Sequence, residues 1–295
     1  MILYKYFIFN REEIFNNSIT LAAMKQLILV VFVIFASMVD VLGQGGILKP
    51  QGARSAALAQ NAETFKDLNA LFHNQAGLGF IESAGGILSL ERRFMLQGLQ
   101  HASMGFALPV QQGQAFGFTM QYFGNTDYSE IKIGAAYGRK LQENISIGAQ
   151  VDYIGVQIRE GGSEGVVTFE GGVLARLTDN ILLGVHVFSP VGVRFSNDYR
   201  LPTIFRMSTQ IEVSPTVSIF AGADKDIEEK ENLKFGVEYN YLDKASFRIG
   251  TGTYPTAVSF GFGFKALSDA MIIDFAAQWN QLLGYTPALT LGYEF

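Results

Sequence analysis

The sequence has no cysteine among its 295 residues. This absence excludes a disulfide framework, thiolate catalysis, thiolate metal sites and a lipid-modified N-terminal cysteine. Charged residues make up only 17% of the chain, and a formal net charge of -5 provides no basic footprint for nucleic acid. Glycine (32 residues) and aromatic residues (13%) are abundant instead, a composition that favours alternating β-structure in lipid.

The most apolar stretch lies near the N-terminus. Lys25 precedes the apolar run 27–36, and the small-residue end 41–43 follows it. This order is typical of a secretory signal peptide, so we predict that residues 1–43 are removed. The alternative is a membrane anchor, but the run is shorter than the roughly 20 apolar residues of a spanning helix. Acidic residues before Met24 are unusual in a targeting segment, so Met24 is predicted to be the true start.

Residues 44–85 do not follow the strand pattern of the rest of the chain. Apolar residues between 56 and 65 recur at roughly helical spacing. Asp67 is placed to cap a second short helix at 68–72, and the glycines and asparagine of 74–79 suit an irregular backbone. We therefore predict that 44–85 is a short helical plug.

The rest of the chain shows a period of two. In 115–122 large apolar residues alternate with small or polar ones, and the pattern recurs at 131–138, 145–153, 233–241 and 258–265. A soluble β-sandwich also alternates in this way. However, the segments have about the ten residues that a tilted strand needs to cross a bilayer, and aromatic residues stand near their ends. The pattern therefore predicts an all-β fold, a transmembrane antiparallel β-barrel of about 14 strands.

The predicted barrel covers residues 86–295. An even number of strands brings the start and the end of the barrel to one side, where the shorter turns should face the periplasm. The plug precedes the first strand on that side, so it should fold into the lumen from there or lie beneath it. The predicted strands are 86–95, 100–110, 114–123, 129–139, 145–158, 165–177, 181–195, 202–213, 216–224, 232–242, 246–254, 257–266, 270–280 and 287–295.

The inner face predicted by this phase carries charges of both signs. One interpretation is a network of ion pairs that fills the lumen and holds the plug, because unpaired charges there would be costly. The other is a polar lining for a passing substrate. The residues singled out as lumen-facing are Asp152, Glu170, Arg176, His186, Arg206, Glu238, Arg248 and Asp274.

No catalytic pattern accompanies these charges. The histidines His73, His101 and His186 form no His-x-x-His or His-Glu-x-x-His motif, and Gly-x-Ser-x-Gly is absent. We therefore predict no enzyme and no cofactor or metal site.

The chain ends on an alternating segment with a terminal aromatic residue. Leu291, Tyr293 and Phe295 share one face of it. This pattern resembles the signal read by the machinery that inserts outer-membrane barrels. Together with the predicted signal peptide it places the protein in the outer membrane, with membrane lipid and the insertion machinery as partners.

Residues 52–78 resemble the N-terminal segment of the long-chain fatty-acid transporter superfamily of outer-membrane proteins, whose PorV/PorQ branch serves type IX secretion. The matching positions begin with the Gly-Ala-Arg step ending at Arg54 and continue through Asp67 and Asn69 to Asn74 and Gly77. Gln75 stands where the family usually has proline. The resemblance implies an N-terminal plug built on these positions, and the superfamily's strand number agrees with the count above.

Three functional hypotheses follow. The first is a PorV/PorQ-like accessory of protein secretion or transport, which binds a secretion-system protein at its outer loops or wall. The second is a transporter of small hydrophobic compounds, which predicts an apolar pocket near Phe65, Leu71 and Phe72. The third is a structural barrel subunit of a larger complex, with a sealed lumen.

Overall fold

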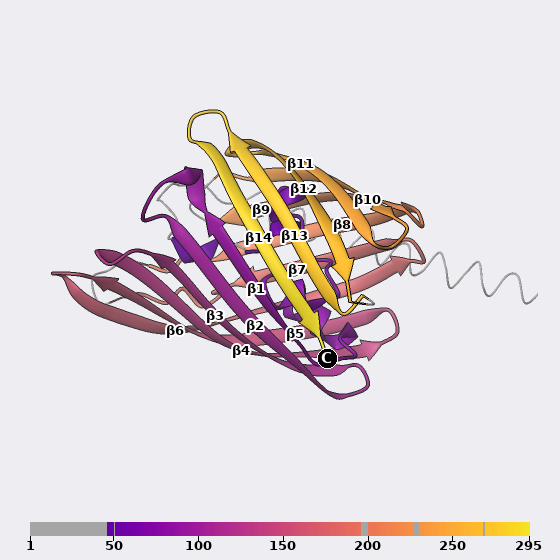
Figure 1. Cartoon of the computed structure of the whole chain (residues 1–295). Coiled ribbons are helices and arrows are strands. Elements are labelled where there is room, and N and C mark those ends of the chain that lie inside the picture. The colour runs from indigo at the N-terminus through magenta and orange to yellow at the C-terminus, as the bar shows by residue number, and fades with distance from the viewer. Residues whose placement is uncertain (1–45, 50, 196–199, 227–229, 268) are drawn as a thin grey trace, which may run out of the picture. The chain divides into compact units, whose positions relative to one another are not determined.

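A computed structural model describes residues 46–49, 51–195, 200–226, 230–267 and 269–295 (Figure 1). The predicted signal peptide, residues 1–43, and the alternative start Met24 lie outside the described residues. Within the described part of the chain, no helix has the length and apolar character needed to cross a membrane.

The described strands form one closed barrel of fourteen strands in which sequence neighbours pair antiparallel. The barrel closes where the first strand pairs with the last, from Gly85 opposite Glu294 to Glu91 opposite Ala288. The strands are β1 (Gly85–Arg92), β2 (Gln100–Gln111), β3 (Gln114–Gly124), β4 (Tyr128–Gln142), β5 (Ile145–Ile158), β6 (Gly162–Thr178), β7 (Ile181–Phe188), β8 (Ile204–Ser214), β9 (Val217–Asp226), β10 (Asn232–Tyr241), β11 (Ala245–Thr253), β12 (Thr256–Ala266), β13 (Met271–Asn280) and β14 (Gly284–Glu294).

The predicted number of strands is confirmed, and most boundaries agree to within a few residues. The main error is the strand predicted at 181–195, because β7 ends at Phe188. The chain then turns inward: Thr203 Oγ1 donates a hydrogen bond to the carbonyl of Ser189 at 2.6 Å, and Phe195 is buried against the plug residue Ile47 and its neighbours. Phe195 lies in a buried apolar cluster although it is not in a strand. In the sequence such a buried apolar residue looks the same as an apolar residue of a strand, so the predicted strand was too long.

The barrel has two unlike ends. We call the end where β1 begins and β14 finishes the terminal rim; its connections include the tight turns 112–113, 143–144 and 179–180. The other end, the opposite rim, carries longer connections, among them 93–99, which includes the short 3₁₀ helix η4 (Arg93–Met95). The alternation of short and longer connections agrees with the sequence prediction in part, since the connection 254–255 at the opposite rim is as short as the turn 112–113 at the terminal rim.

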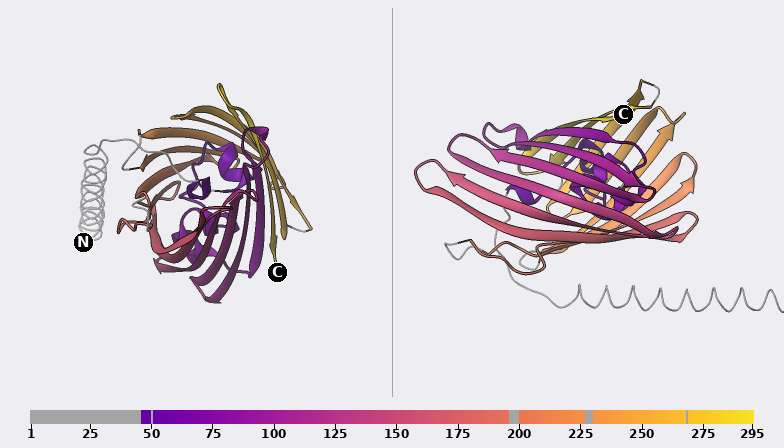
Figure 2. Two further views of the ribbon diagram at one scale, coloured as in Figure 1. Left: turned by 90° about the vertical axis from the view of Figure 1, so that its left-hand side faces the viewer. Right: turned by 90° about the horizontal axis from the view of Figure 1, so that it is seen from below.

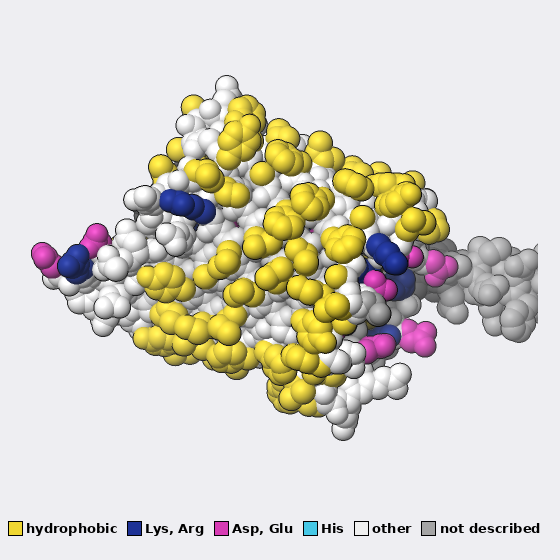
Figure 3. All heavy atoms as spheres, viewed as in Figure 1, with side chains coloured by type: hydrophobic (Ala, Val, Ile, Leu, Met, Phe, Trp, Pro, Cys, Tyr) yellow, Lys and Arg dark blue, Asp and Glu magenta, His cyan; other side chains and the backbone are white. Residues whose placement is uncertain are grey.

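The outer face of the strands is apolar. Phe116, Phe118, Phe260 and Phe262 each expose between 49% and 53% of their surface. Figure 3 shows such side chains spread across the strands, with charged side chains toward the strand ends. A continuous apolar surface of this kind is unfavourable in water, and it indicates an apolar environment such as lipid.

The plug occupies the inside of the barrel, where Figure 2 (left) shows it in indigo within the ring of strands. It consists of η1 (Gly46–Leu48), α2 (Ala53–Ala57), η2 (Leu68–Phe72) and η3 (Gln75–Phe80). Gly46–Leu48 lies near the opposite rim, where the backbone N–H groups of Gly46 and Ile47 each donate to the Glu130 carboxylate at 2.9 Å. The segment therefore runs through the lumen from the opposite rim to Gly85, rather than entering from the terminal rim or lying beneath it.

The short helices of the plug follow the sequence prediction in part. Asp67 caps η2 as expected, since its side chain accepts a hydrogen bond from the Asn69 N–H at 2.9 Å. The helix expected from the apolar spacing between residues 56 and 65 does not form. The helix α2 ends at Ala57, because Ala59 and Gln60 have φ values of 54° and 66°. These left-handed conformations cannot continue a right-handed helix.

Candidate functional site

The inner surface of the barrel and the plug together form the candidate site. Seven of the eight predicted lumen residues are buried there, with exposed fractions of 0–8%: Asp152, Glu170, His186, Arg206, Glu238, Arg248 and Asp274. They come from different strands, and the plug supplies partners for several of them. The contacts separate into clusters at different places along the lumen.

The first cluster is centred on Arg54 of α2. Its guanidinium binds both carboxylate oxygens of Glu238 (3.0 and 2.9 Å) and one oxygen of Asp67 (2.5 Å). Arg248 Nε donates to the same Glu238 carboxylate at 2.6 Å, and its Nη1 donates to Asp274 at 2.5 Å. Burial disfavours the charge on Arg54, but the carboxylates of Glu238 and Asp67 more than offset this and raise its pKa. The cluster ties α2 to β10, β11 and β13.

The second cluster joins β4, β5, β6 and β7. Lys132 Nζ lies 3.1 Å from Glu170 and 3.6 Å from Asp152. His186 Nε2 lies 3.7 Å from the same Glu170 carboxylate. The plug residue Gln75 donates to the other oxygen of Glu170 at 2.8 Å. Gln75, which replaces the family's usual proline, therefore supplies a plug contact that proline could not make.

A third cluster surrounds Glu63, which sequence reasoning missed. Glu63 is fully buried in the plug, bonds to the Ser208 hydroxyl and lies 3.8 Å from Lys234 Nζ. Lys234 also donates to Asp224 at 2.6 Å. The alternation along β10 predicts that Lys234 faces the lumen. Nothing in the sequence predicts that Glu63 is buried, because an acidic residue outside the strands normally lies in solvent.

The remaining positions of the family resemblance shape the plug backbone. Asn74 caps η3 by accepting from the Ala76 N–H at 3.1 Å, and its amide donates to the carbonyls of Glu63 (2.7 Å) and Val173 (3.2 Å). A side chain at Gly77 would overlap the carbonyl of Phe65. Asn69 donates to Asp67 at 3.0 Å. These residues hold the turns of the plug together and to the wall.

Two predicted lumen residues take different roles. Arg206 Nη2 donates to the Leu48 carbonyl at 2.9 Å, so it fastens the start of the plug. Arg176 is half-buried at the terminal rim and donates to the carbonyl of Asp179 at 3.2 Å. Its phase is inward, and burial together with the nearby charge of Arg176 lowers the pKa of the plug residue Lys66, so Arg176 stays a predicted lumen residue.

The C-terminal residues lie on the outside. Tyr293 exposes 43% and Phe295 exposes 74% of its surface. The Phe295 ring lies 5.2 Å from Tyr293 and 6.3 Å from Phe106, centre to centre. Leu291, Tyr293 and Phe295 stay a predicted insertion signal, since an outward position is required for that role but does not establish it.

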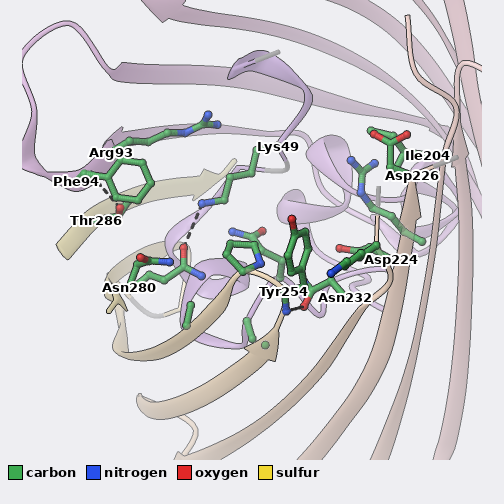
Figure 4. Close-up of a pocket in the computed structure, with 18 residues that line it drawn as sticks. Lys49, Arg93, Phe94, Ile204, Asp224, Asp226, Asn232, Tyr254, Asn280 and Thr286 are labelled. Carbon is green, nitrogen blue, oxygen red and sulfur yellow. Dashed lines mark hydrogen bonds between the residues drawn. The ribbon is translucent and has the colours of Figure 1, made fainter. Parts of the chain in front are cut away.

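Two sizeable cavities lie between the plug and the wall in the part of the chain that the structure describes, besides one of about 10 Å³ beside Phe72 and Glu170. The larger, of about 280 Å³, is near the opposite rim, and Figure 4 shows Lys49 and Arg93 on one side of it and Asp224 and Asp226 on the other. The smaller, of about 190 Å³, is near the terminal rim beside Arg54. Within the described residues, no group of three or more His, Asp or Glu side chains could hold a metal ion.

The plug is expected to loosen in acid. Burial lowers the pKa of His73 from 6.5 to about 4, so the packed plug favours the neutral ring. The packed form of the plug is therefore stabilised fully above pH 6.5, where the ring is neutral in both the packed and the open form. This stabilisation is lost as the pH falls from 6.5 through 4, because the open form takes up the proton first. Since one pKa unit corresponds to about 1.4 kcal/mol, the difference is about 3 kcal/mol. Bilayer conductance measured from pH 7.5 to 3.5 should rise across this range.

The His73→Leu variant is the control for this prediction. It has no titrating ring at the site, so its conductance step between pH 6.5 and 4 should be smaller. Glu63 should act at lower pH: although burial raises its pKa, Lys234 and the Ser208 hydroxyl hold it below the usual value. Any change centred below 4.5 should therefore persist in His73→Leu. An unchanged step near pH 5 would contradict the assignment to His73.

The fold is similar to that of solved FadL-type transporters. A FadL homologue from Pseudomonas aeruginosa aligns with a TM-score of 0.63 at 13% identity, over 84% of this chain and 99% of that chain. The Pseudomonas putida toluene transporter TodX aligns with a TM-score of 0.66 at 11% identity, over 84% and 99%. A deletion mutant of TodX, a monoaromatic hydrocarbon channel, gives 0.69 at 12% identity, over 84% and 100%.

At these identities the similarity establishes the fold alone. It agrees with the resemblance of residues 52–78 to the fatty-acid transporter superfamily, whereas the PorV/PorQ branch stays a prediction. These solved neighbours are transporters and channels, not enzymes. No protein-family model matches the sequence, and no curated protein matches it significantly.

Proposed function

We propose that the protein is an outer-membrane transporter of small hydrophobic compounds. The observation that carries this proposal is a closed fourteen-strand barrel with a plug in its lumen, a fold shared with a FadL homologue and with a toluene transporter. The apolar outer surface fits lipid, and the outward Phe295 fits insertion into the outer membrane. The proposed partners are therefore membrane lipid, the barrel-insertion machinery and a hydrophobic ligand.

The route of the ligand differs from our expectation. The side chains expected to line an apolar pocket, Phe65, Leu71 and Phe72, are at most 8% exposed and pack in apolar clusters, and Phe72 borders a cavity of only about 10 Å³. Phe65 also packs edge-on against Phe220 and lies under Arg54. A hydrophobic ligand therefore has to displace part of the plug. For the secretion-accessory role, none of the described contacts supplies a specific argument.

Uptake of labelled toluene tests this proposal. Host cells without their own FadL-type transporter should accumulate toluene several times faster when they produce the protein than when they carry an empty vector. An unrelated porin at equal abundance in the outer membrane controls for general leakiness. Uptake no faster than with the porin would contradict the proposed transport.

A further inference from the structure

The two cavities face the same four strands. Asn232, Gly252, Ala257 and Gln278 line the cavity near the opposite rim. Glu238, Arg248, Gly263 and Asp274 line the cavity near the terminal rim. On each of β10, β11, β12 and β13, only a few residues therefore separate one cavity from the other. The two cavities lie one above the other along one side of the lumen.

A single layer of plug backbone, residues 57–60, separates them. A side chain at Gly250 would come within 2.5 Å of Ala59 N, and one at Gly261 within 2.7 Å of the Ala57 side chain. Ser259 donates to the Ala57 carbonyl at 3.2 Å. The small residues of β11 and β12 thus let the plug lie directly on the wall, where it blocks passage from one cavity to the other.

This layer is held in a strained form. Ala59 and Gln60 both have left-handed φ values, which are unfavourable for residues other than glycine. Lys234 Nζ holds the turn by donating to the Gln60 carbonyl at 2.7 Å. The strain indicates a segment whose alternative conformation is accessible once this contact is released.

Gln60 also points to a ligand. Its side chain is only 7% exposed and lines the larger cavity, yet among the described residues neither its amide nitrogen nor its amide oxygen has a hydrogen-bond partner. An unpaired buried amide costs free energy that a donor and acceptor group of a solute would recover. Gln278 lines the same cavity, so amide groups reach it from both the plug and the wall.

The charges around the path are balanced in sign. Four cations, Lys49, Arg93, Arg206 and Lys230, line the larger cavity with the two anions Asp224 and Asp226, and Figure 4 shows Lys49 and Arg93 across the cavity from the two aspartates. The smaller cavity is lined by three cations and four anions: Arg54, Arg248 and Lys265 with Asp67, Glu238, Asp243 and Asp274. Over both cavities the lining carries seven cationic and six anionic side chains. The path as a whole therefore builds no strong field of one sign, which favours neutral molecules with hydrogen-bonding groups over ions.

We propose that the lumen contains a second, polar path along β10–β13 for small neutral solutes that carry hydroxyl or amide groups, with Ala57–Gln60 as its gate. The path rests on the proposed membrane-spanning barrel but not on transport of hydrophobic compounds. Displacement of the four gate residues joins the two cavities. The rest of the plug keeps its contacts with β2–β7 in this open form.

Arabinose flux into proteoliposomes, measured by swelling, tests the gate. The Leu58→Ala variant shortens a fully buried gate side chain that packs against Gly236. Its arabinose flux should be severalfold above that of the unmodified protein. The Leu71→Ala variant is the matched control: Leu71 is equally buried in the plug but packs against Gly105 and Gly117 on the β2–β3 side. Its flux should equal that of the unmodified protein.

The Gln60→Gly variant provides a second, independent test. Glycine adopts φ 66° without strain and lacks the unpaired amide, so the variant should fold and should change arabinose flux without a change in the apolar core. Equal fluxes in the Leu58→Ala and Leu71→Ala proteins, or no change in either gate variant, would overturn the path. If only the gate variants respond while toluene uptake is absent, the polar path stands and the hydrophobic transport fails.

Discussion

The Arg54→Met variant is expected to loosen the plug by about 3–5 kcal/mol, the cost of breaking a buried ion pair by removing one partner. The side chain of Arg54 is 17% exposed, and it binds Glu238, whose side chain is 4% exposed. Without the guanidinium, Glu238 keeps only Arg248, and Asp67 loses its charged partner. The cluster then has one cation, Arg248, for the three carboxylates of Asp67, Glu238 and Asp274, where it had two cations before.

Limited trypsin cleavage measures this loosening. The described plug has two bonds that trypsin cleaves, after Arg54 and after Lys66, because Lys49 precedes Pro50. Arg54→Met removes the first, so the rate is followed at the bond after Lys66, which all the variants share. A change of about 3 kcal/mol in the opening equilibrium corresponds to about a hundredfold faster cleavage, if opening is fast relative to cleavage. Mass spectrometry identifies the cut, and the heat-dependent mobility of the barrel in detergent gels shows whether the strands stay folded.

The Arg159→Met variant is the matched control. Arg159 also forms a 2.8 Å ion pair, with Asp127, but the two side chains are 69% and 66% exposed at the opposite rim. Water replaces such a partner at little cost, so plug cleavage should be unchanged. Arg54→Lys should fall between the two, since it keeps the charge but loses the bidentate geometry. If Arg54→Met and Arg159→Met behave alike, the Arg54 cluster does not hold the plug.

The architecture could be predicted because its signals are local. In a strand each side chain alternates between lipid and lumen, so period two reveals both the strands and the inward position of residues such as Glu238 and Arg248. In the same way, Asp67 caps the helix that directly follows it. Neither inference needs information about residues far away in the sequence.

The contacts of the site could not be predicted because they depend on barrel closure. Arg54 and Glu238 are 184 positions apart, and their distance is set by the register of the strands between them. The path of the plug through the lumen could not be predicted either. An even number of strands places the start of β1 and the end of β14 at the same rim, but it does not show at which rim the plug begins. The left-handed turn at Ala59 and Gln60 also has no local signal, because neither residue is a glycine. Tertiary contacts, above all the one with Lys234, maintain this turn.

The Gly184→Ala variant is expected to displace the plug through one added methyl group. A side chain there would overlap the backbone carbonyl of Glu63, which cannot move without the ion-pair cluster around it. Overpacking of a filled interior costs about 1–3 kcal/mol, and more where the obstacle is backbone. Because Asn74 also donates to this Glu63 carbonyl, the strain should spread to the turn before η3. Trypsin cleavage of the plug should again accelerate by one to two orders of magnitude, at about 1.4 kcal/mol per tenfold change.

The Gly292→Ala variant separates this steric effect from the general effect of alanine in a strand. Gly292 lies on β14, also on the inner side, but an added side chain would be 3.8 Å from its nearest neighbour, Ile272. Alanine there reduces the conformational entropy of the unfolded chain by about 0.5–1 kcal/mol relative to glycine, so the barrel should be unchanged or slightly more stable. If Gly184→Ala destabilises the packed plug while Gly292→Ala leaves the stability unchanged or raises it, the plug backbone lies directly on β7. Equal effects would mean that the plug yields at Gly184 and that its position there is not fixed.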